Sequence, residues 1–254
     1  MKKLEPVIKN KFGEKLDTWV ESPEGQIKAT VILVHGFGTS KHETAGYFDD
    51  IALALANDHF RVVRFDFSGY GKSEGSPIDV CYTKHVEDLQ IIIEWVKENF
   101  QEETHIFAQS MGCFVTALAL PSGIGKILMT GIPTSDPKLI VARFSERYGK
   151  KPGGKIDYEG ISLLPRTSGA IQQIGPNFWR DILSMSPVEQ IVKLSKITEL
   201  KIIHWNQDEV LGTDHLRKYD SIKSLEAVWL DGDHSVSKPA DRQNFIKVML
   251  DFYN

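Results

Sequence analysis

Short apolar runs rich in β-branched residues alternate with amphipathic stretches along most of this chain of 254 residues. The runs are nearly continuous in apolar residues, as in strands covered by helices on both faces, because neither side of such strands meets water. The stretches between them have the helical period. This alternation predicts an α/β fold with a mainly parallel, doubly wound sheet flanked by helices. We expect strands at residues 15–21, 27–34, 61–67, 104–108, 126–130, 201–205 and 225–230.

The alternation breaks down between residues 133 and 186. This segment contains five prolines, the pair Gly153-Gly154 and several aromatic residues. A structureless loop of this length would be unusual in a compact domain, so we expect a small inserted cap, or lid, with structure of its own. The predicted organisation is a core formed by residues 1–132 and 187–254, with the cap at 133–186.

Composition and charge narrow the class of protein. Hydrophobic residues at 41% and charged residues at 25% are ordinary values for a globular chain. A formal net charge of -4 gives no general attraction to phosphate backbones, so nucleic acid is not an expected partner. The chain has no signal-like start and no apolar stretch of about 18 residues, which predicts a cytoplasmic protein without a membrane span.

Two cysteines, Cys81 and Cys113, are too few for a disulfide framework or a four-cysteine zinc site. We expect both thiols to be buried small side chains rather than reagents. The sequence leaves the oligomeric state open, with a homodimer as one alternative.

A serine between small residues follows the predicted strand at 104–108. Ala108, Ser110 and Gly112 form a small-x-Ser-x-Gly pattern, and an amphipathic helix begins directly afterwards. Strand, tight turn and helix in this order are the context of a nucleophile elbow, where small neighbours let the two backbones approach closely. The bare pattern occurs by chance in many chains, so its context makes Ser110 the candidate nucleophile. The N–H of Met111, at the helix start, would point toward a developing oxyanion.

A glycine-rich loop, His35-Gly36-Phe37-Gly38, follows the predicted strand at 27–34. Its glycines let the chain turn at the carboxyl edge of the sheet, and the N–H of Phe37 could supply the second donor of an oxyanion hole. The alternative is an ordinary strand-to-helix loop. We expect His35 to be a structural hydrogen-bonding residue rather than a base.

An acid and a base follow the last two predicted strands. Asp208 comes just beyond one strand end, and His234 lies in a glycine-containing turn after the next. From these positions Asp208 can orient His234, and His234 can reach Ser110 over the sheet edge. Their neighbours Glu209 and Asp233 are the alternatives, and we expect the first to be solvated and the second to shape its turn.

These segments together resemble the α/β-hydrolase superfamily over nearly the whole chain. The order Ser, Asp, His is the order expected for that fold. Within the superfamily the chain is most similar to small capped serine carboxylesterases, including the cinnamoyl (feruloyl) esterase and monoacylglycerol lipase groups. The resemblance implies that residues 66–73 brace the floor of the active site. The matching segments are His35 to Gly38, Asp66 to Ser73, Ala108 to Gly112, Gln207 to Val210, and Gly232 to His234.

The chain is therefore expected to be a serine hydrolase that cleaves a small-molecule carboxylic ester through an acyl-enzyme. Ser110 attacks the carbonyl, His234 takes the proton, Asp208 orients the imidazole, and the amides of Phe37 and Met111 hold the oxyanion. This chemistry needs no metal and no organic cofactor. A thioesterase, a peptidase or a carbon–carbon bond hydrolase could use the same triad, and a non-catalytic ligand-binding protein could have the same fold.

The cap supplies candidates for a substrate pocket. Its aromatic side chains could wall an acyl pocket, or they could pack the cap's own small core. These aromatic residues are Tyr148, Tyr158, Phe178 and Trp179. Three basic residues of the cap, Arg143, Arg147 and Arg166, could favour acidic or phenolic substrates.

Overall fold

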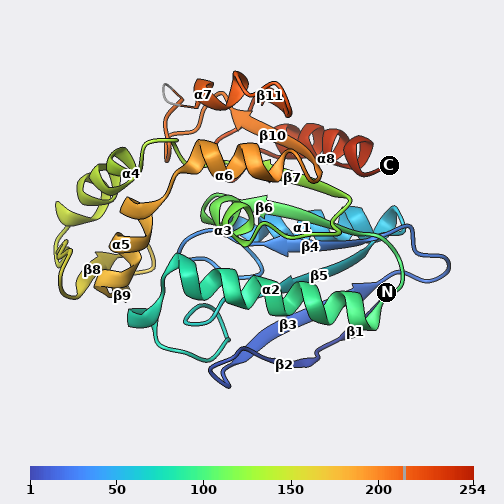
Figure 1. Cartoon of the computed structure of the whole chain (residues 1–254), viewed down its shortest axis with the longest axis horizontal. Helices are drawn as coiled ribbons and strands as arrows, with labels where there is room; N and C mark the ends of the chain where they lie inside the picture. The colour runs from blue at the N-terminus through green and yellow to red at the C-terminus, as the bar shows by residue number, and fades with distance from the viewer. Residues whose placement is uncertain (214–215) are drawn as a thin grey trace.

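The computed structural model describes residues 1–213 and 216–254, and its centre is a twisted sheet (Figure 1). In the described residues the sheet has nine strands in the order β1-β3-β5-β4-β6-β7-β10-β11, with β2 paired to β3. The strands from β5 to β11 in this order are parallel, and β3 is antiparallel to β5. The strands are β1 Lys2–Leu4, β2 Val7–Lys9, β3 Lys15–Ser22, β4 Thr30–Val34, β5 Arg61–Phe65, β6 Thr104–Gln109, β7 Lys126–Thr130, β10 Glu199–Trp205 and β11 Glu226–Leu230.

This sheet confirms the predicted fold class. Each of the seven expected strands is present, although β4 begins at Thr30 rather than at residue 27 and β5 ends at Phe65. Every residue of β4 and β6 is buried, as the continuous apolar runs indicated. Sequence analysis missed β1 and β2, because these edge strands are only three residues long and mostly exposed.

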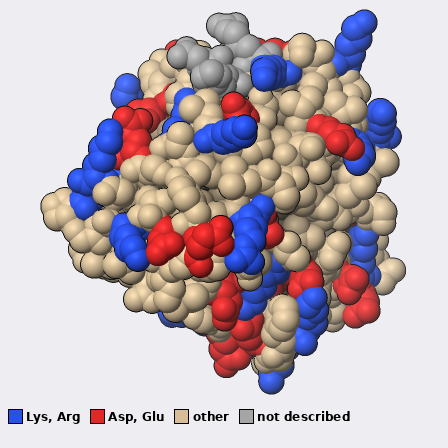
Figure 2. Space-filling model, turned by 60° about the vertical axis from the view of Figure 1, so that its left-hand side comes forward, with Lys and Arg blue, Asp and Glu red and all other residues tan. Residues whose placement is uncertain are grey.

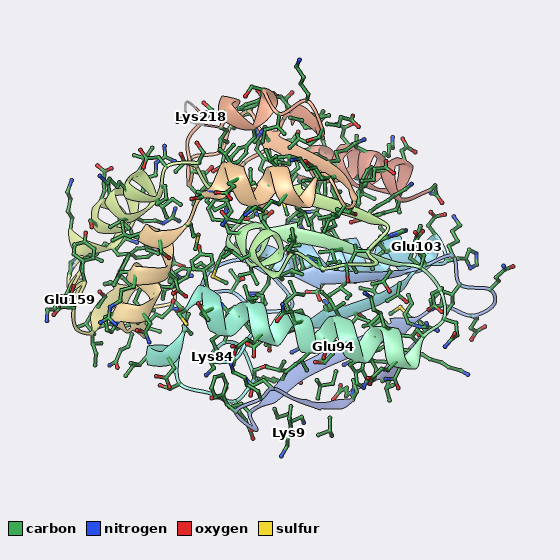
Figure 3. All side chains as sticks on the ribbon, viewed as in Figure 1. Lys9, Lys84, Glu94, Glu103, Glu159 and Lys218 are labelled. Atoms are coloured by element: carbon green, nitrogen blue, oxygen red, sulfur yellow. The ribbon has the colours of Figure 1, made fainter. Side chains whose placement is uncertain are left out.

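Helices cover both faces of the sheet, and side chains fill the space between the layers (Figure 3). Helices α1 and α8 pack on one face, where Phe48 and Phe245 belong to one buried cluster. Helices α2, α3 and α6 cover the other face, where Leu89, Val115 and Ile191 belong to a second cluster. The helices are α1 Tyr47–Asn57, α2 Tyr82–Asn99, α3 Met111–Ala119, α6 Pro187–Leu194, α7 Arg217–Asp220 and α8 Pro239–Tyr253, with 3₁₀ turns η1 Thr44–Gly46 and η2 Pro77–Asp79.

A small cap lies at one end of the molecule, on the left in Figure 1. Its elements are helix α4 Pro137–Phe144, the π-helical turn η3 Ser145–Gly149, the hairpin β8 Ser162–Pro165 with β9 Ile171–Ile174, and helix α5 Pro176–Ser184. Helix α5 packs against α4 and α2, and the N–H of Gly175 donates to the Ile78 carbonyl of the core at 3.0 Å. The division into 1–132, 133–186 and 187–254 stays a prediction.

The surface is mixed in charge on the face that Figure 2 shows, where positive and negative side chains are interspersed. Within the described ranges, no helix combines the length and the apolar character that crossing a bilayer requires.

Candidate active site

Ser110 lies in the sharp turn between β6 and α3. Its backbone angles, φ 52° and ψ -119°, are unfavourable for a residue with a Cβ. Its N–H donates to the Thr130 carbonyl at 2.9 Å, which helps to hold the turn. A Cβ on Gly112 would lie 2.4 Å from the carbonyl oxygen of Val34, so the glycine lets α3 pass close to β4. This geometry is that of a nucleophile elbow.

Two backbone amides beside Ser110 lack an acceptor in the described part of the chain. Neither Phe37 nor Met111 donates its N–H to an acceptor within residues 1–213 and 216–254. Met111 is the first residue of α3, so the helix dipole adds positive potential there. The loop that contains Phe37 passes beside the serine, since a Cβ on Gly36 would lie 3.1 Å from the Cβ of Ser110.

Asp208 and His234 form a close pair at the carboxyl ends of β10 and β11. The Nδ1 of His234 lies 2.7 Å from Oδ2 of Asp208. The other carboxylate oxygen accepts the N–H groups of Val210 at 3.0 Å and Leu211 at 2.8 Å. Asp208 is buried, so its orientation is fixed by backbone rather than by water. The arrangement holds the imidazole with Nε2 directed away from the carboxylate.

The environment of His234 raises the pKa of its imidazole. Burial alone lowers this pKa, but the hydrogen bond and charge of Asp208, with the charges of Glu43 and Glu209, outweigh burial. The pKa therefore lies above its ordinary value of 6.5. The carboxylate beside it therefore makes this imidazole a stronger base than a free one.

The Ser110 hydroxyl makes no hydrogen bond to a described side chain, and neither does Nε2 of His234. Both residues nevertheless line one cavity. Hydrogen bonds between nucleophile and base are often long without substrate and tighten when it binds.

Gln109 and Gly131 fix the position of the His234 loop. The side-chain amide of Gln109 donates to the His234 carbonyl at 2.8 Å, and its oxygen accepts from the hydroxyl of Thr130. Gly131 has φ 55°, and a Cβ there would lie 2.9 Å from Cε1 of His234. The imidazole thus packs against a position where no side chain fits. Sequence reasoning assigned neither residue a role.

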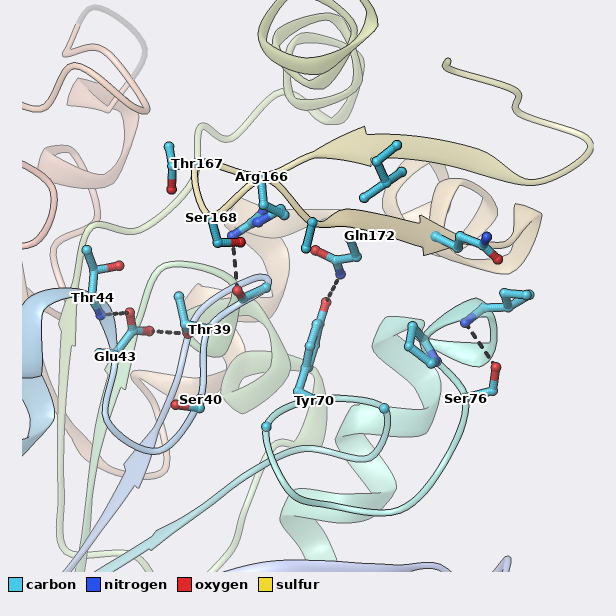
Figure 4. A pocket seen from close by; sticks show the side chains of 18 residues that line it. Thr39, Ser40, Glu43, Thr44, Tyr70, Ser76, Arg166, Thr167, Ser168 and Gln172 are labelled. Carbon is cyan, nitrogen blue, oxygen red and sulfur yellow. Dashed lines mark hydrogen bonds between the residues drawn. The ribbon is translucent and has the colours of Figure 1, made fainter. Parts of the chain in front are cut away.

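Glu43 is a further carboxylate in this site, and sequence analysis did not single it out. Its backbone angles, φ 54° and ψ -174°, belong to a region populated almost only by glycine. One carboxylate oxygen accepts the N–H of Gly36 and, at 3.0 Å, the hydroxyl of Thr39. The other accepts the N–H of Thr44 at 3.1 Å (Figure 4). Glu43 therefore anchors the loop that presents the Phe37 amide.

The loop is also braced from the core side. Asp66 accepts the N–H of Lys41 at 2.6 Å and that of Lys72 at 2.8 Å, and it pairs with the buried Lys41 ammonium at 3.0 Å. The Nε2 of His35 accepts the N–H of Phe67 at 3.0 Å. Burial lowers the pKa of His35, which keeps it neutral. These contacts agree with a bracing role for residues 66–73 and a structural role for His35.

The cavity over Ser110 has a volume of about 560 Å³, an ordinary size for a small-molecule site. Ser110, His234, Phe37 and Met111 line it from the core, and Tyr148 lines it from the cap. The three basic cap residues of the sequence analysis, Arg143, Arg147 and Arg166, also line it.

Three of the aromatic residues expected in the pocket lie elsewhere. Phe178 and Trp179 are 0% and 1% exposed, and both rings pack against Phe144 rather than facing the cavity. Tyr158 is 42% exposed and packs on the outer side of Trp179. Their placement matches the alternative from the sequence, a small core of the cap, because rings packed edge to face bury more apolar area against each other than against an open cavity.

A second, more polar hollow of about 740 Å³ adjoins the cavity (Figure 4). Arg166, Thr39, Glu43 and Thr44 line both spaces. The guanidinium of Arg166 donates to the Gly38 carbonyl at 3.0 Å and to the Tyr148 hydroxyl at 3.1 Å. Arg166 therefore links the cap to the loop that contains Phe37 and Gly38, at the boundary between the two spaces.

The described residues contain no group of three or more His, Cys, Asp or Glu side chains that could hold a metal ion. Both cysteines are buried, and burial raises the pKa of each thiol, that of Cys81 to about 11. Neither thiol is suited to act as a nucleophile at neutral pH.

Comparison with known proteins gives a partial family match. A family model described as serine aminopeptidase, S33, matches residues 25–128. A 2-hydroxy-6-oxononadienedioate/2-hydroxy-6-oxononatrienedioate hydrolase of Paraburkholderia phymatum is 29% identical over 121 residues, which cover 46% of this chain and 41% of the relative. The chain spans less than two thirds of the length of the curated relatives it matches.

Solved structures match over nearly the whole chain. Est1E from Butyrivibrio proteoclasticus, solved with ferulic acid bound, has a TM-score of 0.76 and 18% identity, covering 97% of this chain and 98% of that one. An esterase from Pyrococcus furiosus has a TM-score of 0.74 and 17% identity, covering 99% and 90%. At such identities the likeness establishes the fold.

Sheet order, elbow geometry and these matches agree, and the chain has the α/β-hydrolase fold. Esterases are among the structures that share its fold from end to end, and the Paraburkholderia hydrolase is among the sequence relatives of one part of it.

Proposed function

We propose that this protein is a serine hydrolase that cleaves a carboxylic ester of a small molecule through an acyl-enzyme. Ser110 is the nucleophile, His234 the general base and acid, and Asp208 the residue that orients the imidazole. The amides of Phe37 and Met111 stabilise the oxyanion. A cytoplasmic location remains a prediction from the sequence.

The mechanism follows from the order of these groups around the cavity. His234 removes the Ser110 proton as the hydroxyl oxygen attacks the ester carbonyl, and the two amides bind the oxyanion. The imidazolium then protonates the departing alcohol, leaving an ester bond between Ser110 and the acyl group. Water then attacks the acyl carbonyl as its proton passes to His234, and the imidazolium protonates the Ser110 oxygen, which releases the carboxylic acid and regenerates the serine. The negative charge of Asp208 stabilises the imidazolium in both halves.

The observation that best supports the proposal is the setting of Ser110. A serine at φ 52° borders a cavity that also contains an Asp-bound histidine and two amides without an acceptor among the described residues. Strained backbone at a cavity is typical of functional residues. A purely structural serine would need neither the strained turn nor the free amides.

Ester turnover by matched variants tests the proposal. Wild-type protein should hydrolyse p-nitrophenyl butyrate, and Ser110→Ala should lower kcat on the order of 10⁴-fold or more. Ser195→Ala, at the end of α6 and outside the cavity, is the control and should retain wild-type activity. Turnover that survives in Ser110→Ala would refute the role of this serine.

A second candidate reaction, hydrolysis of a carbon–carbon bond, is favoured by the similarity to the Paraburkholderia enzyme. A panel of a butyrate ester, the matching thioester, the matching anilide and a β-diketone separates it from thioesterase, peptidase and esterase activity. Preference for the diketone over the ester would replace our proposal. Failure of all four substrates would favour a non-catalytic ligand-binding protein.

A further inference from the structure

The cavity over Ser110 has a cationic side that the proposed reaction does not use. Arg143 lies near the end of α4, and Arg147 lies in the π-helical turn that continues it. Both side chains line the same cavity as Ser110 and His234. The cap thus directs two guanidinium groups at the space where a substrate would bind.

The guanidinium of Arg143 is held in place by packing, but one of its nitrogen atoms makes no hydrogen bond to a described residue. Its Nη1 atom is buried and has no hydrogen-bond partner in the described part of the chain. Its Nη2 packs against the loop after Asp208, since a Cβ on Gly212 would lie 2.9 Å from it. Buried polar groups nearly always have a partner, and an unpaired buried charge is especially unfavourable. Among the described residues this acceptor is missing, and a ligand in the cavity could supply it.

The acidic residues of the cavity do not provide that acceptor. Three glutamates also line the space, but in the described ranges none forms an ion pair with Arg143 or Arg147. Glu43 accepts the N–H of Gly36 in the loop that contains Phe37. Glu146 pairs with Lys150 at 3.6 Å, and Glu209 is solvent-exposed. These glutamates are Glu43, Glu146 and Glu209.

We propose that the natural substrate bears a carboxylate and that Arg143 is the residue that recognises it, with Arg147 adding positive charge. A planar guanidinium matches the two oxygens of a carboxylate. The nearby glutamates favour a singly charged group over a dianion such as phosphate, because each adds repulsion. The inference deepens the proposed ester hydrolysis and rests on it, since it concerns the substrate of the same cavity.

Two pairs of esters test this inference and distinguish where the carboxylate lies. In the first pair the charge is on the acyl group: mono-p-nitrophenyl adipate against the p-nitrophenyl ester of adipamic acid. In the second it is on the alcohol: 4-carboxyphenyl butyrate against 4-carbamoylphenyl butyrate. Each pair replaces a carboxylate by a carboxamide of nearly the same shape. Wild-type protein should prefer the carboxylate in one pair by roughly 10- to 100-fold in kcat/KM, mainly through KM.

Variants assign the preference to a residue. Arg143→Gln should lower kcat/KM for the preferred carboxylate ester roughly 10-fold or more, and far less for its carboxamide partner. Arg143→Lys keeps the charge and should restore part of the preference. Arg180→Gln, on the exposed side of α5 and outside the cavity, is the matched control and should retain the wild-type preference.

Equal use of both members of each pair would overturn the inference while leaving the ester hydrolase intact. An equal loss for both members in Arg143→Gln would mean that Arg143 only supports the loop at Gly212. If neither pair is hydrolysed, the proposed function fails, and calorimetry on Ser110→Ala decides on the subsite alone. Monomethyl adipate should then bind more tightly than methyl adipamate, and equal binding would refute the subsite.

Discussion

Replacing Glu43 separates the chemistry of its carboxylate from the strain in its backbone. The carboxylate bonds Gly36, Thr39 and Thr44, so its removal frees the loop that presents the Phe37 amide. A hydrogen bond to a charged group contributes roughly 1.5–3 kcal/mol, and loss of one oxyanion donor costs about 3–4 kcal/mol. Because the donor is displaced rather than deleted, we expect Glu43→Ala to lower kcat by about 10- to 100-fold.

Glycine at the same position removes the carboxylate and also the strain. Glu43 has φ 54°, which costs a residue with a Cβ roughly 1–2 kcal/mol. Glu43→Gly should therefore lose as much kcat as Glu43→Ala but unfold with a free energy about 1–2 kcal/mol higher than that variant. Glu43→Gln keeps an acceptor for Gly36 and should lose less activity.

Steady-state hydrolysis of p-nitrophenyl butyrate and chemical denaturation measure these effects. Glu94→Ala, on the exposed side of α2, is the control for loss of a glutamate. The pH profile gives an independent check: Glu43 raises the pKa of His234, so the acid limb of kcat/KM should move to lower pH in Glu43→Gln. Full kcat in Glu43→Ala would refute the anchoring role.

Three further changes test the frame around the site. Gly131→Ala places a Cβ 2.9 Å from Cε1 of His234, so ester kinetics should show at least a roughly 10-fold fall in kcat with little change in far-UV dichroism; unchanged kcat would contradict the packing. Gly112→Ala places a Cβ 2.4 Å from the Val34 carbonyl oxygen, so it should lower the free energy of unfolding by roughly 1–3 kcal/mol or prevent folding. A denaturation curve like that of the wild type would contradict the close approach of α3 and β4. Asp208→Asn should lower kcat on the order of 10⁴-fold and move the acid limb to lower pH, because the charge that raises the pKa of His234 is lost; an unmoved limb would refute this origin.

The pair formed by Asp208 and His234 affects the free energy of unfolding as well as the rate of hydrolysis. Because the pKa of His234 is raised in the fold, its contribution is fully present below the ordinary value of 6.5 and is lost as pH rises through the raised pKa. The difference in unfolding free energy between wild type and Asp208→Asn should therefore shrink as pH rises through that range. A difference that grows with pH would contradict the sign of this shift.

Strand ends explain why the candidate site was predictable from the sequence. Ser110 and Asp208 follow largely buried apolar strands, His234 follows the half-buried strand β11, and parallel strands bring their carboxyl ends to one edge. The alternation that predicted the strands therefore also predicted which polar residues could meet. The edge strands β1 and β2 were not predicted, because they form by pairing with β3 rather than from an apolar pattern of their own.

The roles of Glu43, Arg143 and the aromatic residues of the cap could not be predicted, because they depend on contacts between residues far apart in the sequence. Glu43 adopts a backbone conformation that its residue type disfavours, so only the contacts around it reveal its role. Phe178 and Trp179 differ from Tyr148 in facing the cap core instead of the cavity, and composition treats all three alike. The unpaired Nη1 of Arg143 can be recognised only from the contacts of the described residues around it.

The most direct test of the central claim is to map the adduct of a fluorophosphonate on the intact protein by peptide mass spectrometry. We predict one phosphonylated residue, Ser110, with labelling slowed strongly in His234→Ala and abolished in Ser110→Ala. Labelling at a different serine, or none at concentrations that inhibit ester turnover, would contradict the assignment of Ser110 as the nucleophile.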